Sequence, residues 1–278
     1  MMKRVLSVLF SLLAVSALVR AEGRFEVYDF DGFKLHVYCT GDVMADASFI
    51  VEGKDSLVTL EPPLFKENAA EFESYVARLA KPVAKSVFDY HLGSVQSPNV
   101  VMPEGMPAFV KGEVYDGMMQ GFARQFGDAM VEIYDGAASE VPFGKTQNWA
   151  GVSFEFRRGA SSDFPGASIL IGGKVYYTHW TPSEAHVSHL QISSAEGIDA
   201  EIAEAENSLA SGAQLFVGGH GCAAGRDAVE FKISYLKKMK ELLAASQTAQ
   251  SFVEAMKEAY PDLPGAAGLD ELGKAFFK

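Results

Sequence analysis

Residues 86–94 decide how the chain folds, and they read S-V-F-D-Y-H-L-G-S. They close the apolar run P-V-A-K-S-V-F of residues 82–88, which predicts a buried strand. A His followed by Leu-Gly at a strand end is typical of a metal-binding turn, yet Ser86, Phe88 and Tyr90 are poor metal ligands. The stretch alone permits three interpretations: a lost metal site, a rebuilt one, or an ordinary strand end.

Hydrophobic periodicity on either side of this stretch predicts an alternation of strands and helices. Alternating and buried apolar runs predict strands at residues 25–30, 33–38, 47–52, 57–60, 83–88, 152–156, 167–171, 174–177 and 213–218. Helical spacing predicts helices at residues 68–79, 114–126, 198–209, 227–245, 249–259 and 269–277. Thr181-Pro182-Ser183-Glu184 has the form of a capping box and predicts a short helix at that point. Hairpins with a few helices in each half predict two similar sheets, each covered on one side.

In this order of elements the chain resembles the metallo-β-lactamase fold, which includes glyoxalase II-type hydrolases. Five segments carry the resemblance: Leu57-Val-Thr-Leu-Glu-Pro, residues 86–93 in place of His-x-His-x-Asp-His-x-Gly, Asp163-Phe-Pro-Gly-Ala, Val175-Tyr-Tyr-Thr-His-Trp, and Val217-Gly-Gly-His-Gly before a long helix. The resemblance implies an αββα sandwich, two mixed sheets flanked by helices, as a single domain over residues 22–278. It also implies a metal-dependent hydrolase, although a shared fold is only an associational guide to function.

The resemblance places metal ligands at positions where this chain keeps few of them. These positions are Ser86, Phe88, Tyr90, His91, Asp163, His179 or Trp180, and His220. Only His91 and His220 keep the imidazole that the resemblance leads us to expect. A two-zinc site needs about twice the ligands of a single one, so it is not available here. One zinc or iron ion could be held by His91 and His220 with Asp163 or His179, and the sequence leaves open whether any metal is bound.

Each histidine also has an interpretation without metal. His91 alone would be a hydrogen-bonded histidine at a strand end. His186 and His189 lie three residues apart on the short predicted helix, which indicates a solvated helical face. His36 alternates with Leu35 and Val37, so we expect it at the surface of a strand.

Four further residues are predicted to line the cleft implied by the resemblance: Phe88, Tyr90, Trp180 and Cys222. Core packing explains part of this aromatic content. The sharper interpretation is a cleft lined with apolar surface that suits a hydrophobic small molecule. Two functions therefore stand side by side: a hydrolase with at most one metal and unidentified catalytic residues, or a non-catalytic protein that binds a ligand or partner in this cleft.

The first 21 residues have the form of a secretory signal peptide. A basic start with Lys3 and Arg4 precedes an apolar run over residues 5–19, and Val19 and Ala21 are small residues suited to cleavage. Their removal takes three of the 24 basic residues and no acidic one, so 21 remain against 36, a formal charge of −15. We expect an exported protein, periplasmic or secreted. It should have no nucleic-acid partner and no membrane partner after cleavage.

The chain has two cysteines, Cys39 and Cys222, far apart in sequence. An oxidising compartment permits a disulfide, but two buried thiols are equally compatible with the composition. In the fold that the resemblance implies, both cysteines lie on the same side of the domain. We therefore expect them near one another, with a disulfide permitted but not favoured.

Overall fold

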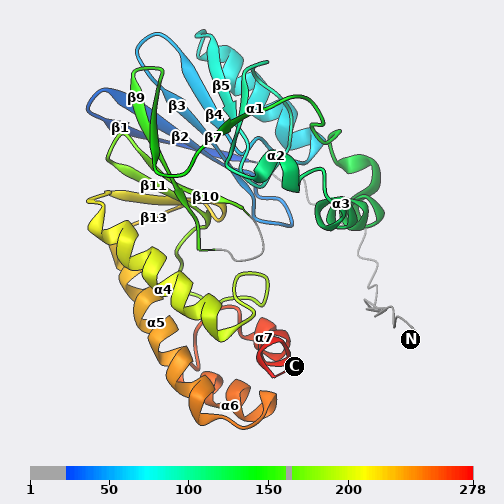
Figure 1. The fold of residues 1–278 in the computed structure, drawn as a ribbon, viewed down its shortest axis with the longest axis vertical. Coiled ribbons are helices and arrows are strands. Elements are labelled where there is room, and N and C mark those ends of the chain that lie inside the picture. Colours follow the sequence, from blue (N-terminus) through cyan, green and yellow to red (C-terminus); the bar gives the residue numbers. More distant parts are fainter. Residues whose placement is uncertain (1–22, 161–164, 278) are drawn as a thin grey trace.

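The computed structural model describes residues 23–160 and 165–277. Within these residues, two mixed sheets pack face to face and helices cover their outer faces (Figure 1). This arrangement confirms the predicted αββα sandwich. The predicted signal peptide at residues 1–21 and the candidate ligand Asp163 lie outside the described residues.

The first sheet follows the sequence order from β1 to β7. Its strands are β1 (Arg24–Phe30), β2 (Phe33–Cys39), β3 (Ala47–Glu52), β4 (Leu57–Leu60), β5 (Val83–Val87), β6 (Val100–Pro103) and β7 (Ser139–Val141). The pairs from β1 to β4 are antiparallel, whereas β4 to β7 pair in parallel. The parallel part brings the carboxyl ends of β4 and β5 to one edge of the sheet.

The second sheet has the order β13-β12-β11-β10-β9-β8. Its strands are β8 (Lys145–Trp149), β9 (Val152–Arg158), β10 (Ala167–Ile171), β11 (Val175–Trp180), β12 (Leu215–His220) and β13 (Ala223–Ala224). Only β11 and β12 pair in parallel, so their carboxyl ends also lie side by side. The strands β6, β7, β8 and β13, each of two to five residues, were not predicted.

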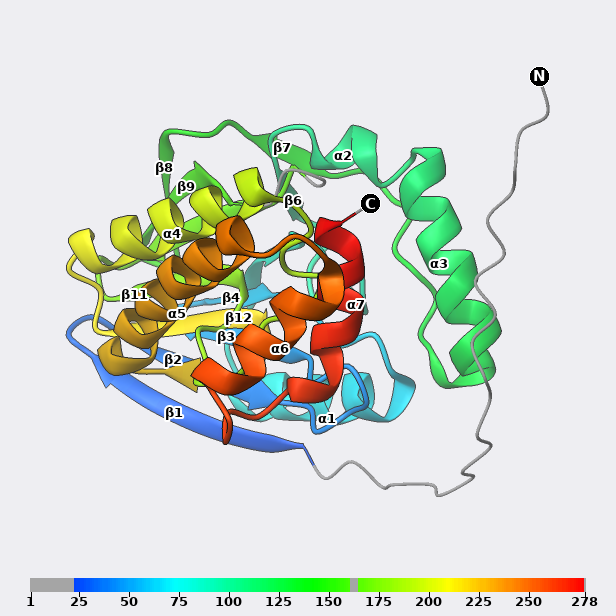
Figure 2. The ribbon, with the colours of Figure 1, turned by 90° about the horizontal axis from the view of Figure 1, so that it is seen from below.

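The helices divide between the two sheets, as Figures 1 and 2 show. Their bounds are α1 (Lys66–Arg78), α2 (Met106–Phe109), α3 (Glu113–Phe126), α4 (Ala195–Ala210), α5 (Arg226–Ala245), α6 (Ala249–Ala259) and α7 (Leu269–Phe276). Helix α1 packs on the first sheet through Phe72 and Val76. Helices α4 and α5 pack on the second sheet through Ala205 and Val229, and α6 and α7 pack beneath them.

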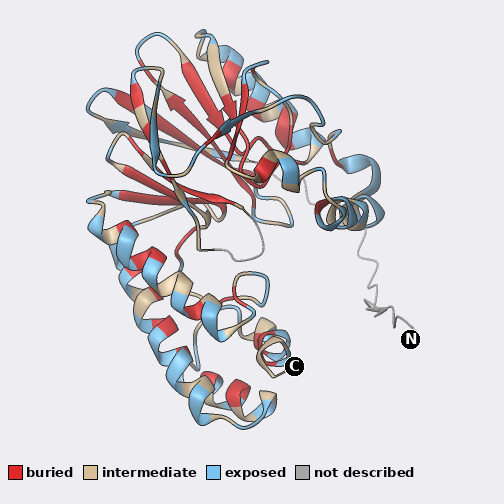
Figure 3. Ribbon diagram, viewed as in Figure 1, coloured by how far each residue is buried: buried red, intermediate tan, exposed pale blue. Residues whose placement is uncertain are grey.

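The main core lies between the sheets, where one face of each strand meets the other sheet (Figure 3). Phe49 of β3 and Tyr177 of β11 meet there, with ring centroids 6.0 Å apart in an edge-on arrangement. Burial of an apolar side chain such as Phe49 contributes about 1.5–3 kcal/mol. Inward-facing residues alternate along the strands because successive side chains point to opposite faces. That alternation is why the sequence pattern predicted the sandwich.

His36 is buried, and the prediction that it lies at the surface of a strand is wrong. Its exposed fraction is 4%. Helix α1 covers the outer face of β2, so a side chain that points away from the sandwich core still lies beneath the helix. His36 satisfies both ring nitrogens there, with Nδ1 2.8 Å from the hydroxyl of Tyr75 and Nε2 2.9 Å from a carboxylate oxygen of Glu52.

The short helix predicted at Thr181 does not form, because Thr181 is used by the neighbouring strand. Its backbone N–H donates to the carbonyl of His220, and its hydroxyl donates to the carbonyl of Cys222. His186 and His189 therefore do not share a helical face. His186 is buried with Nδ1 2.9 Å from the Tyr235 hydroxyl, whereas His189 is exposed. Among the described residues, no helix has the length and apolar character needed to cross a membrane.

Candidate metal centre

Three histidines meet at one edge of the sandwich. His91 follows β5, His179 is the penultimate residue of β11, and His220 ends β12. Each offers one ring nitrogen to a group whose atoms all lie within 4.8 Å of one another. The ring centroid of His220 lies 4.9 Å from that of His91 and 4.7 Å from that of His179.

The parallel pairing of β11 with β12 sets which side chain of β11 reaches this group. Trp180 pairs with His220 in the register, and its ring stacks on that imidazole with centroids 4.3 Å apart. His179, one residue earlier, points to the other side and lies over Gly219, where an added Cβ would be 3.4 Å from its Nδ1. The structure thus brings together His91, His179 and His220 from the four predicted ligands, and Asp163 lies outside the described residues.

His220 is oriented by the loop between β2 and β3. Its Nδ1 lies 3.1 Å from the carbonyl oxygen of Met44 and 2.9 Å from Oδ1 of Asp46. The backbone of the loop is joined to the same turn, because Gly221 N–H donates to the carbonyl of Ala45 at 2.8 Å. A carbonyl or carboxylate at one ring nitrogen is the usual way in which proteins orient a metal-binding histidine, and it leaves Nε2 for the ion.

His91 is held through its backbone by the buried carboxylate of Glu61. Glu61 accepts N–H bonds from Asp89 at 2.6 Å and from Tyr90 and His91 at 3.2 Å each. Its pKa is raised by burial, although the charge of His91 and these N–H bonds oppose the shift. Glu61 also has a positive φ of 50°, which turns the chain sharply after β4. Glu61 therefore fixes the turn that carries His91.

Asp89 ties the same turn to the second sheet. Its carboxylate accepts the backbone N–H of Ala167, at the start of β10, at 2.8 Å. Burial, and then the charge of Glu61, raise the pKa of Asp89 well above its ordinary value. The two sheets are thus joined by buried polar contacts directly behind the histidines.

The electrostatics of the group fit a metal ion. Burial, followed by the charges of His220 and His91, lowers the pKa of His179 well below its ordinary value, so this imidazole is neutral. The buried Nδ1 atoms of His91 and His179 have no hydrogen-bond partner among the described residues. Imidazole nitrogens without hydrogen-bond partners are suitable donors for zinc and several other divalent transition metals.

The opening above the histidines is small and mostly apolar. Its volume is about 70 Å³. Besides the histidines, it is lined by Met44, Leu64, Tyr90, Met118, Met119 and Phe122.

The residues that replace the other expected ligands have structural contacts of their own. Ser86 is buried, and its hydroxyl accepts a bond from Thr59 at 3.2 Å. Phe88 is fully buried and packs edge-on against Tyr134, with ring centroids 5.4 Å apart. The ring of Tyr90 stacks on that of His179, with ring centroids 3.6 Å apart. Gly166 leaves space for the Tyr90 ring, since a Cβ added at Gly166 would lie 2.0 Å from the Tyr90 hydroxyl.

Cys39 and Cys222 form a disulfide, contrary to our expectation that a bond was not favoured. Their Cα atoms lie 5.4 Å apart, because β2 ends beside the turn that follows β12. The bond joins the two sheets two residues beyond His220. Cys222, predicted to line the cleft, thus serves to fix the turn that carries a candidate ligand.

Asp46, Glu61 and Asp89 were not predicted as site residues. Glu61 had a signal, since it stands in the acidic turn Leu57-Val-Thr-Leu-Glu-Pro. Asp89 lies inside residues 86–94, but the expected ligand positions around it are occupied by Phe88 and Tyr90, so it gave no clear signal. Asp46 gave no local signal, because it reaches the histidines only through the pairing of its loop with His220.

Gly219 provides a test of the centre that does not remove any ligand. A Cβ at this position would lie 3.2 Å from Oε2 of Glu61 and 3.4 Å from His91 Cε1, distances that require neighbouring atoms to move by a few tenths of an ångström. We expect Gly219→Ala to weaken zinc binding about tenfold, a loss in the range seen when groups around the ligands are disturbed. Gly225→Ala is the matched control, because no atom lies within 4 Å of its added Cβ. Equal zinc affinities of the two variants, measured by chelator competition, would contradict this placement.

Comparisons with known proteins agree on the fold. No model of a known protein family matches the sequence, and no curated protein matches it. Among solved structures, a metallo-β-lactamase family protein from Thermus thermophilus matches with a TM-score of 0.54 and 13% identity over 93% of each chain. The sec-alkylsulfatase Pisa1 from Pseudomonas sp. matches with a TM-score of 0.59 and 17% identity over 86% of this chain.

A third structure, the DIM-1 metallo-β-lactamase, matches with a TM-score of 0.51 and 12% identity, covering 81% of this chain and 98% of that one. The present chain spans 48% of the length of the alkylsulfatase. Identities this low establish the fold and nothing finer. The chain has the metallo-β-lactamase fold.

Proposed function

We propose that this chain is an exported protein that binds one divalent transition metal, zinc or iron, through His91, His179 and His220. The observation that supports the proposal is the group of three imidazole nitrogens within 4.8 Å of one another. Three protein ligands with an open position are typical of a catalytic zinc. The donor set also suits iron, which favours imidazole ligands.

The same residues favour one ion over two. Ser86 is engaged by Thr59, and Phe88 is turned into the core. Among the described residues, the three histidines form the one group of His, Cys, Asp or Glu side chains close enough to hold an ion. A second metal would lack ligands on the side where the imidazoles expected at Ser86 and Phe88 are missing.

A bound zinc ion would supply Lewis acidity and lower the pKa of a water molecule to about 7. Residues around the three histidines would hold these ligands in position. Asp46 and the Met44 carbonyl orient His220 through its Nδ1. Glu61 holds the turn of His91, and Tyr90 closes one face of His179. The apolar opening limits how much water reaches the ion.

Hydrolysis is the reaction class that we propose for this centre, since structures of the same fold include a β-lactamase and an alkylsulfatase. We expect negligible turnover of the β-lactam nitrocefin by zinc-loaded protein. A single ion must both bind the substrate and activate water, without a second metal to share these tasks.

The measurement is nitrocefin turnover after zinc loading and removal of free metal. A panel of simple esters and an alkyl sulfate would be assayed in parallel to find the substrate class. The His220→Ala variant is the control, because activity that survives in it does not come from this centre. Brisk nitrocefin turnover by protein that holds two tight zinc ions would overturn the assignment of ligands.

The second function is a non-catalytic protein that binds a ligand. The apolar lining of the opening, with Met44, Met118 and Met119, favours it, because methionines adapt to varied ligands. The two functions differ in their dependence on metal. A ligand-binding protein would keep its ligand after treatment with a chelator, whereas a hydrolase would lose its activity.

Export is proposed from the signal-like residues 1–21 and is supported by the Cys39–Cys222 disulfide, since such bonds persist in oxidising compartments. The mass of the protein recovered from the periplasm or medium tests this. It should correspond to a chain that begins at Glu22. A full-length mass in the cytoplasm would contradict export.

A further inference from the structure

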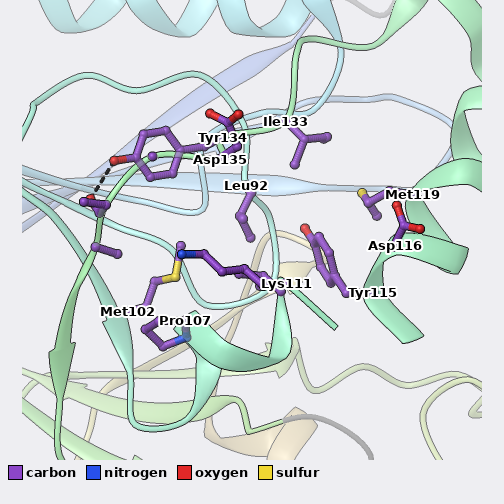
Figure 4. A pocket seen from close by; sticks show the side chains of 14 residues that line it. Leu92, Met102, Pro107, Lys111, Tyr115, Asp116, Met119, Ile133, Tyr134 and Asp135 are labelled. Carbon is purple, nitrogen blue, oxygen red and sulfur yellow. Dashed lines mark hydrogen bonds between the residues drawn. The ribbon is translucent and has the colours of Figure 1, made fainter. Parts of the chain in front are cut away.

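A larger cavity lies beside the metal centre, under α2 and α3 and against the loop of residues 131–138 (Figure 4). Its volume is about 490 Å³, within the range of about 300–1,000 Å³ that is usual for small-molecule sites. It shares Met119 with the opening above the histidines, but its other lining residues are different. The cavity is therefore distinct from the opening above the histidines, and none of the three histidines lines it.

The walls of the cavity are mainly apolar. Leu92, Met102, Val110 and Ile133 line it together with Met119. The two methionines give the wall a flexible, polarizable surface that can fit ligands of different shape. Such a lining favours a ligand with an extended hydrocarbon body.

A buried layer supports this lining. Phe88 and Met106 belong to the same apolar cluster and are fully or almost fully buried. The hydroxyl of Tyr134 donates to the carbonyl of Ala137 at 2.7 Å, which fixes the loop that forms one wall. The phenylalanine that stands in the place of an expected metal ligand thus helps to build the wall of this cavity.

One basic side chain, Lys111, lines the cavity. Figure 4 shows it among the lining residues, together with Asp116 and Asp135. Over the described ranges, Lys111 has no carboxylate within the 4 Å of an ion pair. Asp116 already accepts a bond from the side-chain amide of Gln120 at 2.8 Å. The lining therefore carries two carboxylates and one ammonium group, and Lys111 is the cationic side chain with which an anionic ligand can pair.

We propose that this cavity binds an elongated amphiphile with one anionic head group, such as a medium-chain carboxylate. The hydrocarbon chain lies on the apolar wall, and the head group pairs with Lys111. The chain carries most of the affinity, since each pair of buried methylenes is expected to tighten binding about tenfold. The head group carries less, because Lys111 is exposed and an exposed ion pair changes affinity only about two- to fivefold.

Titration calorimetry with hexanoate, octanoate and decanoate, each below its micelle concentration, tests the proposal. We expect affinity to rise about tenfold with each step of the series. Lys111→Met should weaken decanoate binding about threefold and leave decanol binding unchanged, since it removes the charge and keeps an apolar stem. Lys54→Met, at an exposed lysine in the turn between β3 and β4, is the matched control and should change neither.

Two further variants separate this site from the metal centre. Ala137→Trp, at an exposed position of the wall, should fill the cavity and weaken decanoate binding at least tenfold in a protein that remains folded. His220→Ala should bind decanoate as the unchanged chain does, because His220 lies outside the cavity. No dependence on chain length, unchanged binding by Ala137→Trp, or tighter binding of decyltrimethylammonium than of decanoate would overturn the proposal.

Discussion

A His179→Ala variant is expected to lose zinc affinity by more than about a hundredfold. His179 is the ligand that completes the set, because His91 and His220 alone leave fewer than the three donors that a catalytic zinc requires. Loss of groups that merely support ligands already costs about 10- to 100-fold, so loss of a ligand should cost more. The affinity is measured by competition with a chromophoric chelator.

The matched control is His189→Ala, since His189 is exposed and lies outside the centre. It should bind zinc as the unchanged chain does. His179 also stacks on Tyr90, so the unfolding midpoint of each variant must be measured to show that the protein is folded. A folded His179→Ala variant with full zinc affinity would show that this histidine is not a ligand.

Removal of the disulfide should lower the free energy of unfolding by about 2–4 kcal/mol. The bond joins residues 183 positions apart and links the end of β2 to the turn after β12, so it restricts a long loop of the unfolded chain. We expect this loss in the double variant Cys39→Ala/Cys222→Ala, measured by urea unfolding. Reductant should produce a similar loss in the unchanged protein.

The double variant provides its own control, since reductant has no remaining bond to cleave in it and should leave its midpoint unchanged. Cys222 lies two residues beyond His220, so we also expect weaker zinc binding in the variant. Two titratable thiols per chain in the denatured, unreduced protein would contradict the presence of the bond.

Much of the fold could be predicted from the sequence, because burial on one face leaves a period in the residues. The strand around Phe154 and the helix around Phe72 have such periods, and both form where they were predicted. The hydrophobic period of a strand does not show whether a helix covers the face that points away from the core. His36 was therefore misplaced, since α1 covers the outer side of β2 and buries a polar residue there.

Contacts between distant segments could not be predicted. The capping box at Thr181 is a valid local signal, but the β12 turn takes the hydrogen bonds of that residue. The spacing of Cys39 and Cys222 carries no information about the distance between their Cα atoms. Asp46 approaches His220 only because the β2–β3 loop pairs with the end of β12.

The candidate ligands were predictable where they occupy motif positions. His91 and His220 stand at such positions, and His179 stands one residue before the strand end. The sequence could not decide between His179 and Trp180. The register decides it, because Trp180 pairs with His220 and stacks on it while His179 turns toward Gly219.

The most direct test of the metal centre is the number of zinc ions held per chain. The protein would be dialysed to equilibrium against excess zinc, freed of unbound metal, and analysed by plasma mass spectrometry against its measured concentration. Three imidazoles at one site predict one zinc per chain. A value of zero, or two tightly held ions, would contradict the account.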